Sequence, residues 1–240
     1  SVADRWTETF FDWRNRPVVV KQGGTDTPGT ESTDVNRPLS FVVYDNLNRV
    51  VQAEQYDGDQ YAVSYTDGVP DAPSASLRRA RATSDYDDAG RTWRTRQWSV
   101  DPADGDIDDA LTSQAWFSLR GQVVKSESPN AGFRKSSYDG VGRNTVSYVL
   151  GDIDDTTYAH AFTVTGDIVV EQTETTYDEN SNVLRTVVRQ RFHDETDTGA
   201  LQGPGDSVKA RVYYSGMWYD KGDRPIASVN MGTNGGSTWT

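Results

Sequence analysis

The sequence predicts an all-β protein, an antiparallel meander of β-hairpins that forms a curved or spiralling sheet. Three observations carry this prediction. A six-residue pattern returns at seven places along the 240 residues. The stretches between its copies alternate β-branched or aromatic residues with polar ones, which is the period of a strand. Gly, Pro, Asp and Asn gather between these stretches, where the chain must reverse direction.

The repeated pattern is clearest at residues 138–143, which read Tyr-Asp-Gly-Val-Gly-Arg. An aromatic residue ends one strand, an Asp enters the turn, and an Arg opens the returning strand. The fifth residue is nearly always Gly, Asn or Asp, which tolerate a positive φ. A three-residue hairpin loop closed by a left-handed residue has this requirement. We therefore predict seven hairpin corners, which begin near residues 11, 44, 86, 117, 138, 177 and 219.

Each corner is expected to pair its Asp with its Arg across the hairpin, which fixes the strand register. Two copies depart from the pattern. In the copy at 117–122, Phe117 and Ser118 replace the Tyr and the Asp, and in the copy at 177–182, Asn182 replaces the Arg. No ion pair is expected at these two corners. The residues that we assign to the repeat motif are Asp12, Arg16, Tyr44, Asp45, Arg49, Tyr86, Asp87, Gly90, Arg91, Tyr138, Asp139, Gly142, Arg143, Tyr177, Asp178, Tyr219, Asp220 and Arg224.

This hexapeptide, Tyr-Asp-x-x-Gly-Arg, resembles the signature of the Rhs/YD-repeat family, from about residue 5 to residue 230. That family includes bacterial Rhs proteins, the shell-forming subunits of insecticidal toxin complexes and the teneurin ectodomains. The resemblance implies a wall of β-strands that, in relatives, spirals into a hollow shell around a cargo polypeptide. Asp101-Pro102 is only superficially similar to the self-cleavage motif of Rhs proteins and lies in mid-repeat, so we assign no protease residue.

The composition fits a thin sheet with a limited core. Only 35% of the residues are hydrophobic and the mean hydropathy is −0.72, yet 11% are aromatic, which argues against disorder. Asp outnumbers Glu by 28 to 8, which concentrates the acidity in turns. A net charge of −12 argues against nucleic acid as a partner. The chain has no cysteine and no apolar run of membrane-spanning length.

We read the chain as one array over residues 1–240, with about sixteen strands and without a domain boundary. Two of the expected strands, at 60–65 and 157–165, lie between corners. Loops are expected at 21–37, 66–76, 101–110 and 193–206, and irregular chain at 231–240. Because neither flank looks like a capping unit, we expect a fragment of a longer chain, or edge-to-edge pairing with another copy.

Each candidate chemical site has a simpler structural explanation. The acidic loops at 104–109 and 151–155 space carboxylates as some calcium loops do, but Asp-Gly is also ordinary turn chemistry. His160, in an apparently alternating run, and His193 are the only histidines, and no nucleophile-elbow pattern accompanies them. The arginines between 78 and 96 are expected to face carboxylates on neighbouring strands. We predict no catalytic residue, metal site or cofactor.

The first functional hypothesis is therefore a structural module of a β-strand shell, which serves the encapsulation and delivery of a cargo polypeptide or contact at a cell surface. A second hypothesis is an extracellular adhesion or carbohydrate-binding module that uses Trp93, Trp98, Trp116 and Trp218 on a cell-surface glycan. A hydrolase is a distant third. Each of the first two hypotheses places the protein outside the cell, secreted or at the cell surface.

Overall fold

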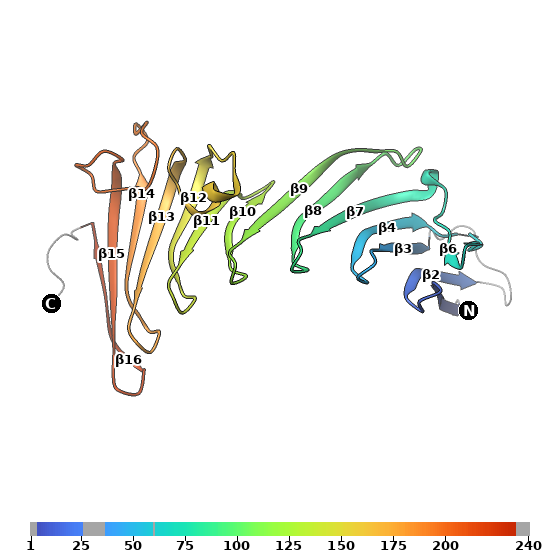
Figure 1. Ribbon diagram of the computed structural model, residues 1–240, viewed down its shortest axis with the longest axis horizontal. Coiled ribbons are helices and arrows are strands. Elements are labelled where there is room, and N and C mark those ends of the chain that lie inside the picture. The colour runs from blue at the N-terminus through green and yellow to red at the C-terminus, as the bar shows by residue number, and fades with distance from the viewer. Residues whose placement is uncertain (1–3, 26–36, 60, 234–240) are drawn as a thin grey trace. The chain divides into compact units, whose positions relative to one another are not determined.

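The computed structural model describes residues 4–25, 37–59 and 61–233, and within them strands dominate (Figure 1). Fourteen strands form one antiparallel sheet in chain order, and β5 and β6 pair separately. This confirms the predicted fold class. The strands are β1 (Asp4–Phe11), β2 (Pro17–Thr25), β3 (Pro38–Tyr44), β4 (Val50–Asp57), β5 (Tyr65–Thr66), β6 (Val69–Pro70), β7 (Arg78–Tyr86), β8 (Thr92–Val100), β9 (Ile107–Phe117), β10 (Val123–Ser128), β11 (Gly132–Tyr138), β12 (Asn144–Asp152), β13 (Ile168–Tyr177), β14 (Val183–Arg191), β15 (Ala210–Tyr219) and β16 (Pro225–Gly232).

Two short 3-10 helices complete the described elements, η1 (Ala75–Leu77) and η2 (Tyr158–Phe162). The chain forms two compact units, residues 1–113 and residues 114–240, with the boundary inside β9. We call them the first and the second unit. Within each unit the hairpin corners lie at one end of the strands and the longer connections at the other (Figure 1).

The core of the first unit lies on one face of β2, β3 and β4. Its buried members are Val18, Val19, Leu39, Phe41 and Tyr56. The connection from β4 to β7 covers this face, because Tyr61, Val63 and Leu77 pack against the cluster. One face of these strands is thus buried by the connection, without a second sheet packed against it.

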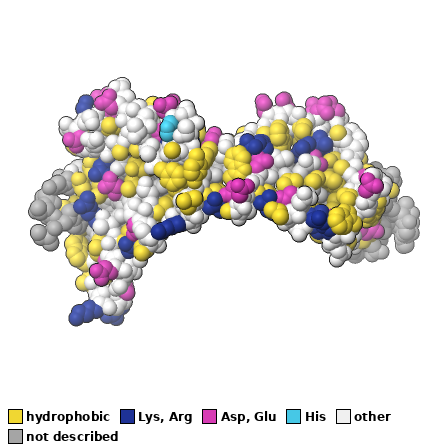
Figure 2. All heavy atoms as spheres, in the orientation of Figure 1, with side chains coloured by type: hydrophobic (Ala, Val, Ile, Leu, Met, Phe, Trp, Pro, Cys, Tyr) yellow, Lys and Arg dark blue, Asp and Glu magenta, His cyan; other side chains and the backbone are white. Residues whose placement is uncertain are grey.

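The core of the second unit is built in the same way from other residues. Leu150, Val169 and Ala210 lie on the sheet, while Val164, Leu201 and Val208 come from the connections that follow β12 and β14. The buried apolar side chains are small in number, which agrees with the low hydrophobic fraction of the sequence. On the face drawn in Figure 2, charged side chains interrupt the hydrophobic ones throughout.

Several predicted boundaries are wrong. The strand expected at 157–165 is replaced by η2. Of the strand expected at 60–65, residue 60 lies outside the described part, and among residues 61–65 only Tyr65 belongs to a strand, β5. The loop expected at 21–37 begins later, because β2 continues to Thr25, and residues 26–36 lie outside the described part. The acidic loop expected at 101–110 ends where β9 begins at Ile107, and β16 continues to Gly232. These stretches are covers or strand extensions, and their conformation depends on what they pack against rather than on local alternation.

Candidate functional site

The seven corners share one backbone geometry. At each corner the N–H of the second residue donates to the carbonyl of the sixth, over 2.8–3.0 Å. The N–H of the fifth residue donates to the carbonyl of the second, over 2.9–3.2 Å. The fifth residue has a positive φ in every copy, from 59° at Asp223 to 95° at Gly142. The predicted three-residue loop with a left-handed closing residue is confirmed at all seven positions.

The Asp carboxylate organises each regular corner with both of its oxygens. In the corner at 138–143, Oδ1 of Asp139 accepts the N–H groups of Val141 and Arg143, at 3.0 and 2.9 Å. Oδ2 accepts Nε of Arg143 at 2.7 Å. The same three contacts recur at Asp12, Asp45, Asp87 and Asp220. One side chain therefore accepts hydrogen bonds from two turn amides and holds the Arg that immediately precedes the returning strand.

The two departing corners keep the turn with neutral substitutes. Nδ2 of Asn182 donates to Oδ2 of Asp178 at 2.9 Å, in the place of the Arg. At the other corner, Ser118 Oγ donates to Gln122 Oε1 at 3.1 Å and accepts the Gln122 N–H at 3.2 Å. As expected, neither corner has the ion pair, but both have the same loop geometry as the others.

These contacts set the ionisation of the corner carboxylates. The side-chain hydrogen bond from Arg143, followed by that from its backbone N–H, holds the pKa of Asp139 below its ordinary value of 3.8. At Asp45 the backbone N–H of Arg49 is the main cause of the lowered pKa. At Asp178 the hydrogen bond from the Asn182 side chain lowers the pKa first. The corner carboxylates thus stay charged at pH values well below neutrality.

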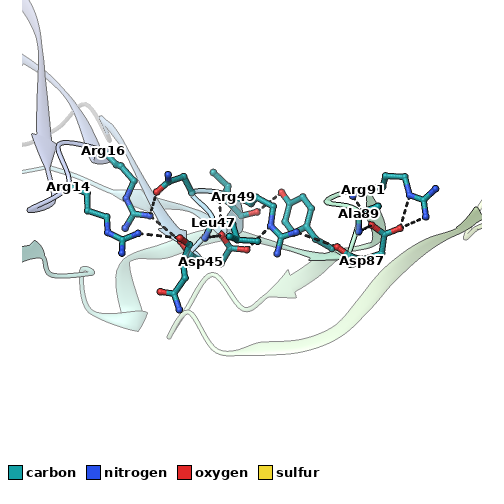
Figure 3. Close-up of polar contacts among 12 residues, drawn as sticks. Arg14, Arg16, Asp45, Leu47, Arg49, Asp87, Ala89 and Arg91 are labelled. Atoms are coloured by element: carbon teal, nitrogen blue, oxygen red, sulfur yellow. Dashed lines mark hydrogen bonds and ion pairs between the residues drawn. The ribbon is translucent and has the colours of Figure 1, made fainter. Parts of the chain in front are cut away.

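Within each unit, an Arg of one corner also reaches the next corner. Figure 3 shows these contacts in the first unit. Nη1 of Arg16 donates to the carbonyl of Asp45 at 3.1 Å, and Nη1 of Arg49 donates to that of Asp87 at 3.4 Å. Arg143 does the same to Asp178 at 2.7 Å. The Arg therefore closes its own hairpin with Nε and caps the neighbouring turn with Nη1, which its planar fork permits.

The Tyr that begins the next corner completes this link. The guanidinium of Arg49 lies 4.6 Å from the ring centre of Tyr86, and that of Arg143 lies 4.9 Å from the ring centre of Tyr177. The hydroxyl of Tyr86 donates to the Val50 carbonyl at 2.8 Å, and that of Tyr177 to the Asn144 carbonyl at 2.8 Å. We call this set of Arg and Tyr contacts between successive corners the corner clip. The sequence prediction placed these residues in the motif but assigned them no contact between corners.

One further motif position was missed. The register shifts at every corner, so that the second residue after the Arg position has no partner opposite it. Such a bulge bends the strand and increases its twist. The residues at this position are all β-branched, aromatic or Leu, a signal that aligning the seven copies would have revealed: Val18, Val51, Trp93, Val124, Thr145, Leu184 and Ile226.

The structure also reveals buried lysines that the sequence prediction did not single out. Lys135 is 3% exposed, and its ammonium contacts Asp155 at 2.7 Å and Asp167 at 2.6 Å. It also donates to the carbonyls of His160 and Thr163, at 2.9 and 2.8 Å. Lys125 joins the network through Asp155 at 2.7 Å. Both lysines lie on the sheet and both acids on the connection from β12 to β13, so the network fastens η2 to the sheet.

Desolvation of Asp155 opposes its ionisation, but hydrogen bonds from Lys125 and Lys135 outweigh it, so the pKa of Asp155 lies below its ordinary value. The rarity of lysine could have drawn attention to this cluster, since the chain has only five lysines. Three of the five, Lys21, Lys125 and Lys135, are buried.

The other candidate residues have structural partners. Nδ1 of His160 accepts the N–H of Thr156 at 3.1 Å from within η2, so the alternating strand expected around it is wrong. Asp101 and Asp104 accept N–H groups two residues ahead, at 2.8 and 3.0 Å, as turn residues do. Within the described ranges, no group of three or more His, Asp or Glu residues is arranged to hold a metal ion.

The arginines between 78 and 96 face carboxylates, as predicted. Arg78 pairs with Glu54 at 2.9 Å, and Arg94 and Arg96 pair with Asp85 at 2.6 and 3.1 Å. Burial, aided by a hydrogen bond to Glu54, raises the pKa of the neighbouring Tyr56 to about 12. The helices in the described part of the chain are too short or too polar to cross a membrane.

Comparison with known proteins gives structural neighbours only. No family model matches the chain, and no curated protein matches its sequence. The crystal structure of TcdB2-TccC3 without its hypervariable C-terminal region aligns with 93% of this chain and 11% of its own length, at 12% identity and a TM-score of 0.34. The crystal structure of TcdB2-TccC3 aligns with 94% of this chain and 16% of its own length, at 11% identity and a TM-score of 0.19. The structure of the Photorhabdus luminescens Tc holotoxin pore aligns with 94% of this chain and 15% of its own length, at 11% identity and a TM-score of 0.20.

Proposed function

We propose that this chain is a structural wall module, a run of clipped hairpins that forms part of a β-sheet shell. The shell would enclose a cargo polypeptide for delivery, or present a surface to other cells, in a secreted or cell-surface protein. The corner clip is the observation that supports this proposal most. It joins one hairpin to the next by side chains of the repeated motif, so the sheet is extended by adding hairpins.

The resemblance of the motif to the Tyr-Asp signature of the Rhs/YD-repeat family supports the same role. A wall module also needs contacts at its sheet edges. Among the described residues, β1 and β16 have one hydrogen-bonded neighbour each, whereas the other strands of the fourteen-stranded sheet have two. An exposed edge strand presents backbone groups on which a further strand can pair. The partner strand would come from the rest of a longer repeat chain or from a neighbouring copy.

Sedimentation of the 240-residue chain over a wide concentration range tests this role. We expect reversible association that the variant Ser228→Lys, on the edge strand β16, weakens, because edge lysines oppose strand addition. Thr95→Lys, an equal charge change on the interior strand β8, is the matched control. A chain that stays monomeric at high concentration, or equal effects of the two lysines, would contradict the proposal.

The proposal includes no catalysis. The surroundings of His160 support the absence of catalysis from the proposal, because Nδ1 of this residue accepts a backbone N–H of its own turn. The test is a panel of glycoside, ester and peptide substrates, on which we expect no turnover above a heat-denatured control. Turnover that His160→Ala or His193→Ala abolishes would overturn this part of the proposal and make the hydrolase hypothesis the better one.

A further inference from the structure

A groove of about 550 Å³ lies on one face of the first unit, over β4, β7 and β8. It is open to solvent beside the covered core, and its lining includes Arg81, Asp85, Trp93, Arg96 and Trp98. Strand pairing sets Arg81 opposite Trp98 and Asp85 opposite Arg94, so these side chains share the face. The corner bulge places Trp93 beside them, one residue outside the regular register.

The aromatic rings of the groove are held in place by polar contacts. Nε1 of Trp98 donates to Oγ1 of Thr83 on the neighbouring strand at 3.1 Å. The guanidinium of Arg94 lies 4.4 Å from the ring centre of Trp93. Both indoles are only partly buried. Fixed, partly exposed rings of this kind provide flat apolar surfaces whose conformational entropy is already low before a ligand arrives.

The charges around the groove are unbalanced. Three guanidinium groups and two carboxylates line the groove, those of Arg49, Arg81, Arg96, Asp45 and Asp85. The ion pairs beside it add the guanidinium groups of Arg78 and Arg94 and one carboxylate, that of Glu54. Arg94 and Arg96 share the single carboxylate of Asp85. This leaves a local excess of positive charge in a chain whose net charge is −12. An anionic ligand, above all one that carries carboxylates, complements the groove.

The backbone beneath the groove excludes one common class of ligand. β4 is hydrogen-bonded to β3 and β7, and β7 to β4 and β8, so the ladder groups of both strands are used on both sides. An extended acidic peptide would gain no strand pairing here and would rely on side chains alone. A saccharide needs no strand pairing, since its hydroxyls and carboxylates bind side chains and its C–H faces bind rings.

We propose that this groove binds an acidic oligosaccharide that carries uronate carboxylates. The rings of Trp93 and Trp98 contact the apolar faces of the sugars, Arg96 and Arg81 bind the carboxylates, and Asp85 accepts hydrogen bonds from sugar hydroxyls. This site is independent of the wall role, because it needs neither edge strand.

Calorimetric titration of the full chain with the hexamer of galacturonic acid tests the proposal. Its methyl-esterified form, which has the same rings without the charges, and a hexaglutamate peptide are the two comparison ligands. We expect saturable binding of the hexamer. The ester, which loses both charge-assisted contacts, should bind about a hundredfold more weakly, and the peptide, which loses a ring contact, about tenfold more weakly.

Two variants locate the site. Arg96→Gln keeps Asp85 paired with Arg94, and Trp98→Ala removes one ring; each should weaken binding by about tenfold. Their controls are Arg79→Gln, on β7 but outside the groove, and Trp218→Ala in the second unit, which should bind like the parent chain. Near-ultraviolet circular dichroism reports whether each variant is folded. If Trp98→Ala does not fold, the binding of Arg96→Gln alone tests the location of the site.

Three results would overturn the proposal. The first is no saturable binding of the hexamer. The second is hexaglutamate binding as tight as that of the hexamer, which would assign the groove to acidic peptides. The third is equal loss of binding in the groove variants and their controls.

Discussion

The two units use the same corners but fasten their covering segments differently. In the first unit, the ammonium of Lys21 donates to the carbonyl of Tyr61 at 2.8 Å, which holds the connection from β4 to β7 on the sheet. In the second unit, Lys135 contacts Asp155, Asp167 and two carbonyls of the connection from β12 to β13. A buried lysine on the sheet thus contacts a cover in both units, and in the second unit the carboxylates of Asp155 and Asp167 are among its partners.

Two kinds of contact thus stabilise the fold, the local contacts of the corners and the long-range contacts of the covers. The corners are local, repeated and alike in both units, and each is individually modest in energy. The covers are long connections whose position depends on a few buried cations. A buried cation must be fully partnered, because an unpaired charge away from water is costly. The largest mutational effects should therefore come from the covers, with smaller ones from the corners.

The largest effect is expected from Lys135→Met. The change leaves Asp167 buried without its cation, and loss of one partner of a buried pair costs about 3–5 kcal/mol. Lys21→Met is the counterpart in the first unit, where it removes the donor to the Tyr61 carbonyl. Hydrogen exchange measured strand by strand distinguishes local from global loss. The double variant Lys135→Met/Asp167→Asn should be more stable than Lys135→Met, and a double variant that is less stable would refute the ionic explanation.

A Val at the left-handed corner position should have the next largest effect. Asn48→Val and Gly142→Val place a β-branched residue at φ values of 64° and 95°, and left-handed backbone costs about 1–2 kcal/mol even for unbranched residues. Because the corners are alike, both units should respond equally in urea denaturation. Ala89→Val, in the same kind of loop but outside the left-handed region, is the control. If Gly142→Val did not lower the stability, the assignment of a required left-handed conformation to this position would be wrong.

Removing a clip hydroxyl should have a smaller effect. Tyr86→Phe and Tyr177→Phe each delete one hydrogen bond to a strand carbonyl, which is worth about 0.5–1.5 kcal/mol. Tyr219→Phe is the matched control, because that hydroxyl donates to the sulfur of Met217 at 3.6 Å, a weak acceptor. Urea midpoints of the three variants measure the difference. A Tyr219→Phe loss as large as the other two would show that the clip hydrogen bond is not the cause.

The smallest effect concerns acid. Because the folded pKa of Asp139 lies below its unfolded value, its contribution to stability is complete above pH 3.8 and is lost as the pH falls through the folded value. The variant Asp139→Ser/Arg143→Gln copies the Ser118–Gln122 corner, which has no titrating group. At pH 7 we expect the variant to lose the contacts of Arg143 with Asp178 and Tyr177. Between pH 4 and pH 2 we expect its urea midpoint to decline less steeply than that of the parent chain. A decline of parental steepness would contradict this role of the carboxylate.

The corners could be predicted from the sequence because every contact that defines them lies within six residues. The Asp, the residue at positive φ and the Arg belong to one loop, so their spacing alone specifies the turn. The same locality explains why Asn182 and Gln122 preserve the loop: the backbone hydrogen bonds remain when the ion pair is lost. The fourteen strands of the main sheet followed from the corners and from period-two alternation.

The covers could not be predicted in this way, because they depend on distant partners. Thr157 to Thr165 alternates as a strand does, yet η2 forms there because Lys135, over twenty residues away, binds its carbonyls. The corner clip was missed for the same reason, since Arg143 and Asp178 are 35 residues apart. Lys21 was assigned to a loop because the following Gly-Gly-Thr masked the continuation of β2.

The meander order of the sheet has a mechanical consequence. Ladder hydrogen bonds in an antiparallel pair lie perpendicular to the strands. A force that pulls an edge strand such as β16 away from its neighbour therefore loads these bonds one after another, as in opening a zipper, rather than all together. Each hairpin would come away as a separate step, with the next corner clip as the point of resistance. A sheet of this order would therefore yield in regular increments when it is drawn out by one end.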